Sequence, residues 1–351
     1  MTQGKRLLLT GHRGYIGSVM APYLMRRGYD VVGLDTGYFN ECTLVTDPVA
    51  VPEVRKDIRD LVPGDVAGFD AVVHLAALSN DPIGNLDATW TESINHGSSV
   101  RLAELAREAG VRRFLFSSSC IMYGMSEAAE VDETSPLDPK TTYARSKVAS
   151  EMAIREMATD GFSPTFLRNG TIYGLSNRMR FDTVLNDLVG SAFTAGKVVA
   201  LSDGTPWRPV IHVEDVARSF HRILEARIDD IHNEAFNNGA DHLNYQVREL
   251  ADFAVAAVPG AMLEMRNDAG ADQRTYRADF SKFRRTFPDF EFKWNARDGA
   301  HDLAQAFARI GLTAEQYAGP SFVRLRWLRQ LLAEGQLDEQ LRWRQPAEVH
   351  A

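Results

Sequence analysis

Short apolar runs alternate with helical patterns over the first 120 residues of the chain. The apolar runs span residues 5–10, 30–35, 71–75 and 112–117, and the helical patterns between them span residues 15–27 and 87–109. This alternation predicts βαβ units and therefore a parallel sheet. Because the runs are apolar on both faces, we expect helices on both sides of the sheet, which is a doubly wound α/β fold.

Net charge and cysteine content exclude several classes of function. The formal charge of −8 lacks the basic surplus that nucleic-acid binding requires, so we expect no nucleic-acid partner. Cys42 and Cys120 are too few for a disulfide framework and fit a reducing compartment. No apolar stretch predicts a signal peptide or a membrane span, and the histidines show no metal-binding spacing. We expect a cytoplasmic protein with no membrane partner and no metal.

A glycine-rich turn follows the first apolar run and leads into a helical pattern. Its sequence is Gly11-His12-Arg13-Gly14-Tyr15-Ile16-Gly17. Glycines let the backbone approach a pyrophosphate, whose charge the start of the helix would stabilise. The spacing is GxxGxxG rather than GxGxxG, so the turn alone leaves an ordinary loop open. Its position between a strand and a helix favours a dinucleotide site.

Acidic residues at the ends of the next strands indicate which dinucleotide is bound. Asp35 ends the second apolar run, where a carboxylate can accept hydrogen bonds from the adenosine ribose and repels a 2′-phosphate. This favours NAD over NADP, although Arg13 could reach a 2′-phosphate and leaves NADP open. Asp57 and Ile58 follow a further predicted strand, where the carboxylate could meet the adenine amino group and the isoleucine could pack on the ring.

Tyr143 and Lys147 are four residues apart in a helical pattern, so their side chains share one face. A nearby ammonium stabilises a phenolate and lowers the tyrosine pKa, which makes Tyr143 a usable general acid or base. An ordinary surface pair is the alternative for these two residues alone. Upstream, Ser119 follows a predicted strand at the edge of the sheet where ligands bind, and it could orient a reacting hydroxyl toward Tyr143.

Taken together, these motifs resemble the extended short-chain dehydrogenase/reductase family, in particular its NAD-dependent nucleotide-sugar epimerases and dehydratases. The resemblance includes HLAA at residues 74–77, Asn95 in INHGS, SSSxxxYG from Ser117 and YxxxK from Tyr143. It covers nearly the whole chain, because residues 208–216 resemble the RxxxHVxDxA segment of these enzymes.

The resemblance implies a Rossmann-type doubly wound parallel sheet with a smaller C-terminal substrate-binding domain. It implies that Ser119, Tyr143 and Lys147 are catalytic, with Lys147 also holding ribose hydroxyls of the cofactor. The implied cofactor-binding residues are Gly11, Arg13, Gly14, Tyr15, Ile16, Gly17, Asp35, Asp57, Ile58, Leu75, Ala76, Ala77, Asn95, Ser117, Tyr143 and Lys147.

A nucleotide-diphosphate sugar, the implied substrate, needs local cations in an acidic protein. Arg178, Arg180, Arg208 and Arg274 are the candidates, since a guanidinium matches phosphate oxygens. Arg208 and Arg274 fall where the resembling enzymes place diphosphate-binding arginines, whereas Thr171 replaces their substrate-binding asparagine. The expected substrate-binding residues are Ser79, Ser119, Cys120, Thr171, Arg180, Arg208 and Arg274.

Residues 120 and 121 distinguish between reactions within this group of enzymes. The 4,6-dehydratases carry an Asp-Glu pair directly after the catalytic Ser or Thr, and Cys120 and Ile121 stand there in this chain. This difference disfavours dehydration. A 3,5-epimerase subgroup uses a cysteine nearby, but that cysteine aligns with Ile121, which favours Cys120 as a small buried thiol.

The residues therefore favour an NAD-dependent nucleotide-sugar epimerase that acts by transient hydride transfer, with C4 as the favoured carbon. A nucleotide-sugar ketoreductase or dehydrogenase that releases its cofactor is the alternative. A non-catalytic NAD(P)-sensing protein belongs to another class, and the intact Ser119, Tyr143 and Lys147 disfavour it, because a sensor needs no proton relay.

The length of 351 residues exceeds what one hydrophobic core supports, so we expect two domains. Residues 1–170, with 205–240 returning to them, are predicted to form the NAD(P)-binding Rossmann domain. Residues 171–204 and 241–351 would form the substrate-binding domain and a helical tail. The amphipathic tail is expected to pack on the body or on a partner subunit. The resemblance also implies a homodimer formed through the helices at 87–109 and 140–158.

Overall fold

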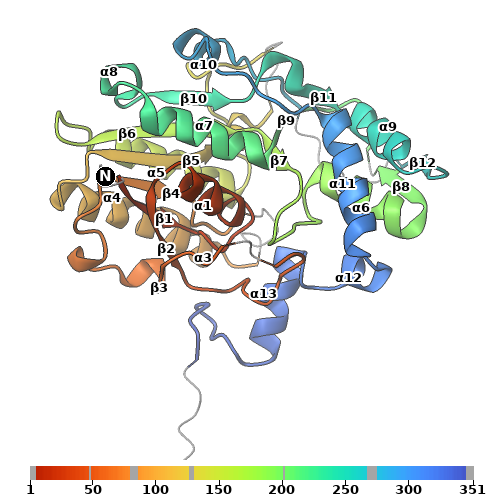
Figure 1. Cartoon of the computed structure of the whole chain (residues 1–351), viewed down its shortest axis with the longest axis horizontal. Coiled ribbons are helices and arrows are strands. Elements are labelled where there is room, and N and C mark those ends of the chain that lie inside the picture. Colours follow the sequence, from red (N-terminus) through yellow and green to blue (C-terminus); the bar gives the residue numbers. More distant parts are fainter. Residues whose placement is uncertain are drawn as a thin grey trace, which may run out of the picture.

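A parallel sheet forms the centre of the molecule (Figure 1). The computed structural model describes residues 5–46, 49–79, 86–125, 130–200, 202–266 and 275–344. Within these ranges, seven parallel strands pair in the order β10-β6-β5-β4-β1-β2-β3. They are β1 (Arg6–Thr10), β2 (Asp30–Asp35), β3 (Glu53–Arg55), β4 (Ala71–His74), β5 (Arg113–Ser119), β6 (Ser163–Asn169) and β10 (Ala235–Asn238). The Rossmann-type doubly wound fold that the sequence predicted is confirmed.

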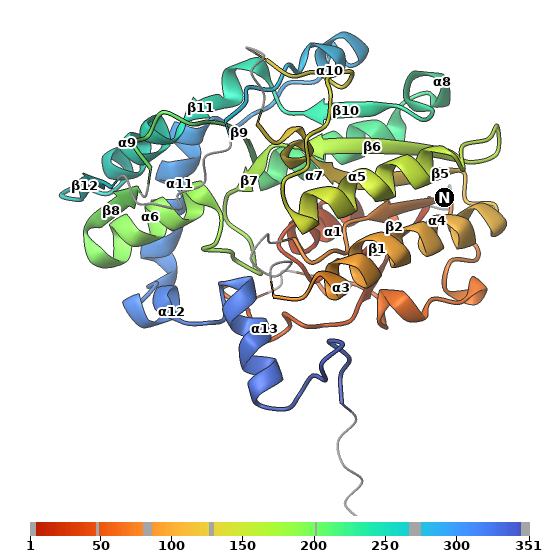
Figure 2. The same cartoon turned by 180° about the vertical axis from the view of Figure 1, so that it is seen from behind.

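Two hydrophobic cores flank this sheet because its strands bury both faces. On β1, Leu8 belongs to one core, whereas Leu7 and Leu9 belong to the other, and all three side chains are fully buried. Side chains alternate across a strand, so an all-apolar run needs cover on both sides. The core of Leu7 and Leu9 includes α1 (Gly17–Arg26) and α7 (Val213–Glu225), and the core of Leu8 includes α4 (Ser98–Glu108) and α5 (Thr142–Arg155), as Figures 1 and 2 show from opposite sides.

A smaller region with its own core lies beside the main sheet (Figure 1). Its strands form a three-stranded sheet, in the order β11-β9-β7, and a two-stranded sheet of β12 and β8. These strands are β7 (Thr171–Tyr173), β8 (Lys197–Ala200), β9 (Trp207–His212), β11 (Asn244–Gln246) and β12 (Met262–Met265). Its longer helices are α6 (Val184–Ala195), α9 (Val247–Ala257) and α11 (Ala296–Ile310).

Several short elements complete the described chain. They are α3 (Ala88–Thr91), the π-helical η3 (Glu92–Gly97), α8 (Ile228–Ile231), α10 (Ser281–Thr286), and the 3-10 turns η1 (Ile58–Asp60), η2 (Pro63–Asp65), η4 (Cys120–Tyr123) and η5 (Asp241–Leu243). Of the helices in the described ranges, none combines the length and the apolar character that crossing a membrane requires.

In the second half of the chain, the sequence pattern predicts helices over residues 183–195, 213–226, 247–257 and 300–310, and these form as α6, α7, α9 and α11. Within the span 205–240, α7 and β10 return to the main sheet, whereas β9 pairs with β7 and β11 in the smaller region. Strand β6 is not among the apolar runs of the sequence, although every one of its residues is buried.

The C-terminal tail packs on the body of the protein, which was one of the two expected arrangements, and it contacts both regions. Phe322 belongs to the core of the smaller region, and Tyr317 packs against that core. The tail contains two helices, α12 (Ala314–Ala318) and α13 (Arg324–Ala333), rather than one long helix. Trp327, Leu328 and Leu331 of α13 belong to the core that contains Leu8 of β1. The tail therefore extends the cofactor-binding side of the molecule, next to β2 and β3 (Figure 1).

Asp215, near the start of α7, forms hydrogen bonds that connect the main sheet region to the smaller region. Its side chain is fully buried, and one carboxylate oxygen accepts hydrogen bonds from the backbone N–H groups of Lys293 (2.9 Å) and Trp294 (3.0 Å). The other oxygen pairs with the guanidinium of Arg218. Since Lys293 and Trp294 lead into α11, this carboxylate connects the smaller region to a helix of the main sheet.

Asp215→Ala is expected to lower the free energy of unfolding by roughly 2–4 kcal/mol, because two backbone N–H groups and a guanidinium lose their partner. Urea denaturation followed by circular dichroism measures the loss. Asp289→Ala, which removes an exposed partner of Arg222, is the matched control and should change stability little. Equal losses in the two variants would contradict the assigned role of Asp215.

Candidate active site

A cleft of about 500 Å³ opens where the carboxyl ends of the main-sheet strands meet the smaller region. Its walls include the ends of β2, β5 and β6 and the turns that follow β1 and β4. Of the predicted cofactor-binding residues, those that line the cleft are Gly11, Gly14, Tyr15, Ile16, Gly17, Asp35, Asp57, Ile58, Leu75, Ala76, Ala77, Ser117, Tyr143 and Lys147. Residues distant in sequence are thus brought to one cavity.

The glycine turn has room for backbone only. A Cβ atom on Gly11, whose φ is +74°, would lie 2.8 Å from the backbone nitrogen of Ala76. A Cβ atom on Gly17 would lie 2.2 Å from the carbonyl oxygen of Gly11. This bare-backbone cradle at the start of α1 fits the pyrophosphate of a dinucleotide, whose charge the helix dipole stabilises. The residues present therefore fit a bound NAD.

Asp35 and Arg13 are held in ways that favour NAD over NADP. The Asp35 carboxylate accepts hydrogen bonds from the backbone N–H groups of Arg13 (3.1 Å) and Gly37 (2.8 Å) and lines the cleft. The Arg13 guanidinium instead binds Glu53, with N–O distances of 2.5 and 2.7 Å. Hydrogen bonding to Arg13 holds the pKa of Glu53 below its ordinary value. Arg13 does not line the cleft, so its side chain is not positioned to make the expected contact with the cofactor.

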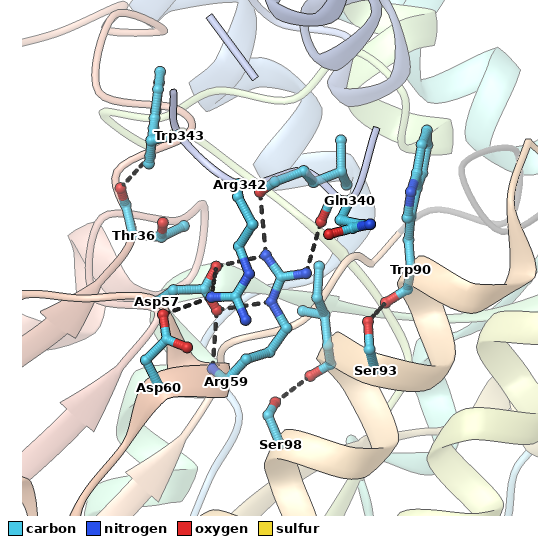
Figure 3. A network of polar contacts seen from close by, with 12 residues as sticks. Thr36, Asp57, Arg59, Asp60, Trp90, Ser93, Ser98, Gln340, Arg342 and Trp343 are labelled. Atoms are coloured by element: carbon cyan, nitrogen blue, oxygen red, sulfur yellow. Dashed lines mark hydrogen bonds and ion pairs between the residues drawn. The ribbon is translucent and has the colours of Figure 1, made fainter. Parts of the chain in front are cut away.

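Asp57 also lines the cleft, but its carboxylate is engaged by the protein (Figure 3). One oxygen accepts hydrogen bonds from the backbone N–H and the Nε of Arg59, both at 2.9 Å. The other oxygen binds Nη2 of Arg59 at 2.6 Å and lies 3.3 Å from Nη1 of Arg342. The expected contact with an adenine amino group competes with these bonds, whereas Ile58 is positioned to pack on a ring.

Asn95 does not line the cleft but positions a segment that does. Its Oδ1 accepts a hydrogen bond from the backbone N–H of Leu78 at 2.7 Å, and its Nδ2 donates to the carbonyl of Leu78 at 3.0 Å. The buried amide thereby fixes the chain after β4, where Leu75, Ala76 and Ala77 form part of the wall. Asn95 therefore positions the cofactor site without facing the cleft.

Ser119, Tyr143 and Lys147 meet at the cleft as the sequence predicted. Ser119 ends β5, and α5 begins at Thr142 with the hydroxyl of Thr141 capping it by accepting the N–H of Ala144 at 3.1 Å. The Nζ of Lys147 donates to the carbonyl of Ser117 at 2.7 Å and lies 5.8 Å from the centre of the Tyr143 ring. A phenol, a buried amine and a hydroxyl at one edge of the sheet can move a proton to or from a bound hydroxyl.

Most of the predicted substrate-binding residues line the cleft, but not all of them do. Arg180 donates to Ser79, through Nη1 to the hydroxyl (2.9 Å) and through Nη2 to the carbonyl (3.2 Å), and both residues line the cleft. Thr171 on β7 and Arg208 on β9 also line it. Arg274 lies outside the described residues.

Cys120, expected among the substrate-binding residues, points away from the cleft. Its side chain is fully buried, and its thiol donates to the carbonyl of Arg168 at 3.1 Å. Burial raises the pKa of this thiol well above its ordinary value. The next residue, Ile121, lines the cleft instead. Cys120 therefore behaves as the small buried thiol that the sequence favoured, and not as a substrate-binding residue.

Some cleft residues were missed at the sequence level. Tyr38 and Phe39 follow β2, Asn169 ends β6, and Arg324 comes from the distant helix α13. A signal for Arg324 exists, since it shares one helical face with Trp327, Leu328 and Leu331 and so falls on the apolar side of the tail.

The fold and the cleft define a Rossmann-type dinucleotide-binding enzyme of the short-chain dehydrogenase/reductase group. Residues 7–239 match the model of the NAD dependent epimerase/dehydratase family, and the chain belongs to this family. It is therefore an NAD-dependent enzyme.

Relatives and solved structures differ in the reaction they are named for. The chain is 28% identical to a UDP-glucose 4-epimerase of Corynebacterium glutamicum over 264 residues, which cover 70% of this chain and 78% of the relative. It is 26% identical to MoeE5, solved in complex with UDP-glucuronic acid and NAD, with a TM-score of 0.75 over 88% of this chain and 100% of that one. TunA, an NAD-dependent NDP-hexosamine 5,6-dehydratase, shares the fold at 22% identity, with a TM-score of 0.78 over 87% of this chain and 98% of TunA.

Burial lowers the pKa of Lys147 to about 7 from an ordinary 10.5. Below about pH 7 the amine is charged in both the folded and the unfolded chain, whereas between pH 7 and 10.5 the unfolded chain holds the extra proton. In cofactor-free protein, Lys147 should therefore add stability as the pH rises through this window. The free energy of unfolding of the native protein minus that of Lys147→Met, measured by urea denaturation at several pH values, should increase with pH across this window. A constant difference would contradict this assignment.

Proposed function

We propose that the protein is an NAD-dependent nucleotide-sugar epimerase, with C4 of the sugar as the favoured carbon. The observation that carries the proposal is the environment just after Ser119, where Ile121 presents an apolar side chain to the cleft and Cys120 is buried beneath it. Neither residue can act as the acid–base pair that eliminates water from a sugar in the 4,6-dehydratases. The cleft thus favours inversion over dehydration.

The carboxylates of the cleft support the same conclusion. Among the described residues, those that line it are Asp35, Asp57 and Asp182. Asp35 accepts two backbone N–H groups, Asp57 binds Arg59, and Asp182 pairs with Nε of Arg180 at 2.8 Å. Each of these carboxylates has a positioning partner, and none belongs to the segment that follows Ser119.

In the proposed mechanism, bound NAD supplies a hydride acceptor in the first half-reaction and a hydride donor in the second. The phenol oxygen of Tyr143 takes the proton of the sugar hydroxyl as that carbon is oxidised, and returns it when the ketone is reduced on its opposite face. The hydroxyl of Ser119 orients the sugar oxygen toward Tyr143. The ammonium of Lys147 favours the phenolate and would hold the ribose hydroxyls of the cofactor.

Cations at the cleft support a nucleotide diphosphate as the carrier of the sugar. Arg180 and Arg208 come from different elements of the smaller region, and both reach the cleft of a protein whose net charge is −8. A guanidinium can bind a diphosphate bidentately. A UDP-sugar is the favoured substrate, because the relative from Corynebacterium glutamicum is named UDP-glucose 4-epimerase.

Incubation with UDP-, dTDP-, GDP- and CDP-sugars and catalytic NAD, followed by proton NMR, tests this function. The expected product is an isomer of unchanged mass that forms without net NADH. Loss of water to a 4-keto-6-deoxy sugar would show that residues 120 and 121 do not exclude dehydration. Turnover that requires a keto-sugar and added NAD(P)H would identify a ketoreductase instead.

Tyr143→Phe is expected to slow turnover by roughly 10²- to 10⁴-fold, because it removes the proton-transferring hydroxyl and keeps the ring. Binding of NAD should persist, which fluorescence titration can measure. Tyr23→Phe, which alters a ring on α1 that contacts His221, is the matched control and should retain full activity. Full activity of Tyr143→Phe would overturn the catalytic assignment.

The proposal includes a homodimer in the cytoplasm, formed through α3, α4 and α5. The side chain of Met152 on α5 is 62% exposed, which leaves a large apolar group on the surface of one of these helices. Light scattering coupled to size exclusion should give twice the chain mass of 39.1 kDa. Met152→Glu should shift the protein toward the monomer if α5 lies at the interface, and an unchanged mass would argue against it.

A further inference from the structure

A buried arginine from the C-terminal helix reaches the cofactor cleft. Arg324, the first residue of α13, is 4% exposed and lines the cleft together with the glycine turn and Asp35. Its guanidinium lies 4.2 Å from the centre of the Phe39 ring, and its Nη2 donates to the carbonyl of Arg178 at 2.7 Å.

One nitrogen of the Arg324 guanidinium lacks a hydrogen-bond partner within the described part of the chain. This nitrogen is Nη1, which is buried, and no carboxylate in the same part of the chain lies within ion-pairing distance of the guanidinium. Burial, with Arg180 nearby, lowers the pKa of Arg324 to about 10, so the group still carries its charge at neutral pH. Asp182, which already pairs with Arg180, attracts the guanidinium only from beyond ion-pairing distance, so burial of this charge is costly and an anion in the cleft would compensate for it.

The surroundings of Arg324 place it at the cofactor half of the cleft. Phe39 lies four residues beyond Asp35, which ends β2. On the other side, the segment that contains Arg178 is bound to the glycine turn, because the Ser176 hydroxyl donates to the carbonyl of Tyr15 at 2.7 Å and lies 2.9 Å from the hydroxyl of Ser18. Arg324 thus enters between the end of β2 and a segment fixed to the start of α1.

The tail that carries Arg324 is anchored to the residues around the cofactor site. Trp327 donates through Nε1 to the carbonyl of Tyr38 at 2.6 Å, and Trp343 donates likewise to the carbonyl of Thr36 at 2.8 Å. Figure 3 shows Arg342 reaching Asp57 and Asp60, at 3.3 and 2.5 Å. These contacts hold α13 against the segments that follow β2 and β3, so the guanidinium is preorganised.

We propose that Arg324 binds a phosphate of the NAD pyrophosphate, so that the C-terminal tail forms one wall of the dinucleotide site. The glycine turn offers the pyrophosphate neutral backbone, and the charge of Arg13 is engaged by Glu53. A guanidinium is suited to this task because its donors match phosphate oxygens in pairs. The inference rests on NAD binding, a property of the family, and not on which sugar reaction the protein performs.

Calorimetric titration of cofactor-free protein with NAD, adenosine and UDP tests this proposal. Arg324→Gln should raise the Kd for NAD roughly tenfold to a hundredfold, as expected for a lost charge-assisted hydrogen bond, and leave the Kd for adenosine, which lacks phosphate, nearly unchanged. Arg324→Lys should recover part of the affinity. Arg329→Gln removes an exposed arginine of the same helix and, as the matched control, should bind NAD normally.

Three results would overturn the proposal. The first is an unchanged Kd for NAD in Arg324→Gln. The second is equally weakened binding of NAD and adenosine, which would assign Arg324 to packing of the tail. The third is weakened binding of UDP alone, which would assign Arg324 to the substrate diphosphate. Thermal unfolding without cofactor establishes that each variant folds, and Arg324→Lys replaces Arg324→Gln if the latter does not. Because none of these titrations needs a sugar, an error in the proposed epimerase reaction would leave their outcome unaffected.

Discussion

The close contact between Gly11 and the backbone at Ala76 is the constraint on which the rest of the site depends. The N–H of Gly11 donates to the carbonyl of Leu34 at 2.8 Å, and its Cα faces the chain that leaves β4. The first turn is thereby fixed between the ends of β2 and β4, which are the two neighbours of β1 in the sheet. Asp35, the segment 75–79 and the start of α1 consequently surround one cavity, which the proposed catalytic groups on β5 and α5 also line.

The first half of this arrangement could be predicted because β1, β2, β4 and β5 contain apolar runs and its motifs are local. The glycine turn, Asp35, Ser119 and the Tyr143–Lys147 pair each lie beside a strand or helix that the apolar pattern reveals. Strand β6 does not stand out as an apolar run because it buries polar side chains. Arg168 pairs with Glu151 at 2.6 Å, and Asn169 donates to the hydroxyl of Ser117 at 3.0 Å. Polar residues that are satisfied by partners distant in sequence produce no apolar run.

Side-chain direction was harder to predict than position. Arg13 and Asn95 both adjoin residues that line the cleft, yet Arg13 turns to Glu53 and Asn95 turns to the backbone of Leu78. Cys120 lies beside Ser119 in sequence, but η4 carries it into the core while Ile121 faces the cavity. Arg324 is the opposite case, since its helical face could be read from the spacing of Trp327 and Leu328, whereas the surface that this face covers depends on the whole fold.

The anchoring of the tail affects the order in which the protein can be completed during its synthesis. The hydrogen bond from Trp327 to Tyr38 joins residues 289 positions apart, and the bond from Trp343 to Thr36 joins residues 307 apart. A ribosome that has reached residue 300 has already made every described strand of the main sheet, but none of α13. Contacts of such long range form late, because the intervening chain must be closed first. A nascent chain can therefore fold its sheet early, whereas the wall of the cleft beside Thr36 and Tyr38 stays open until α13 has emerged.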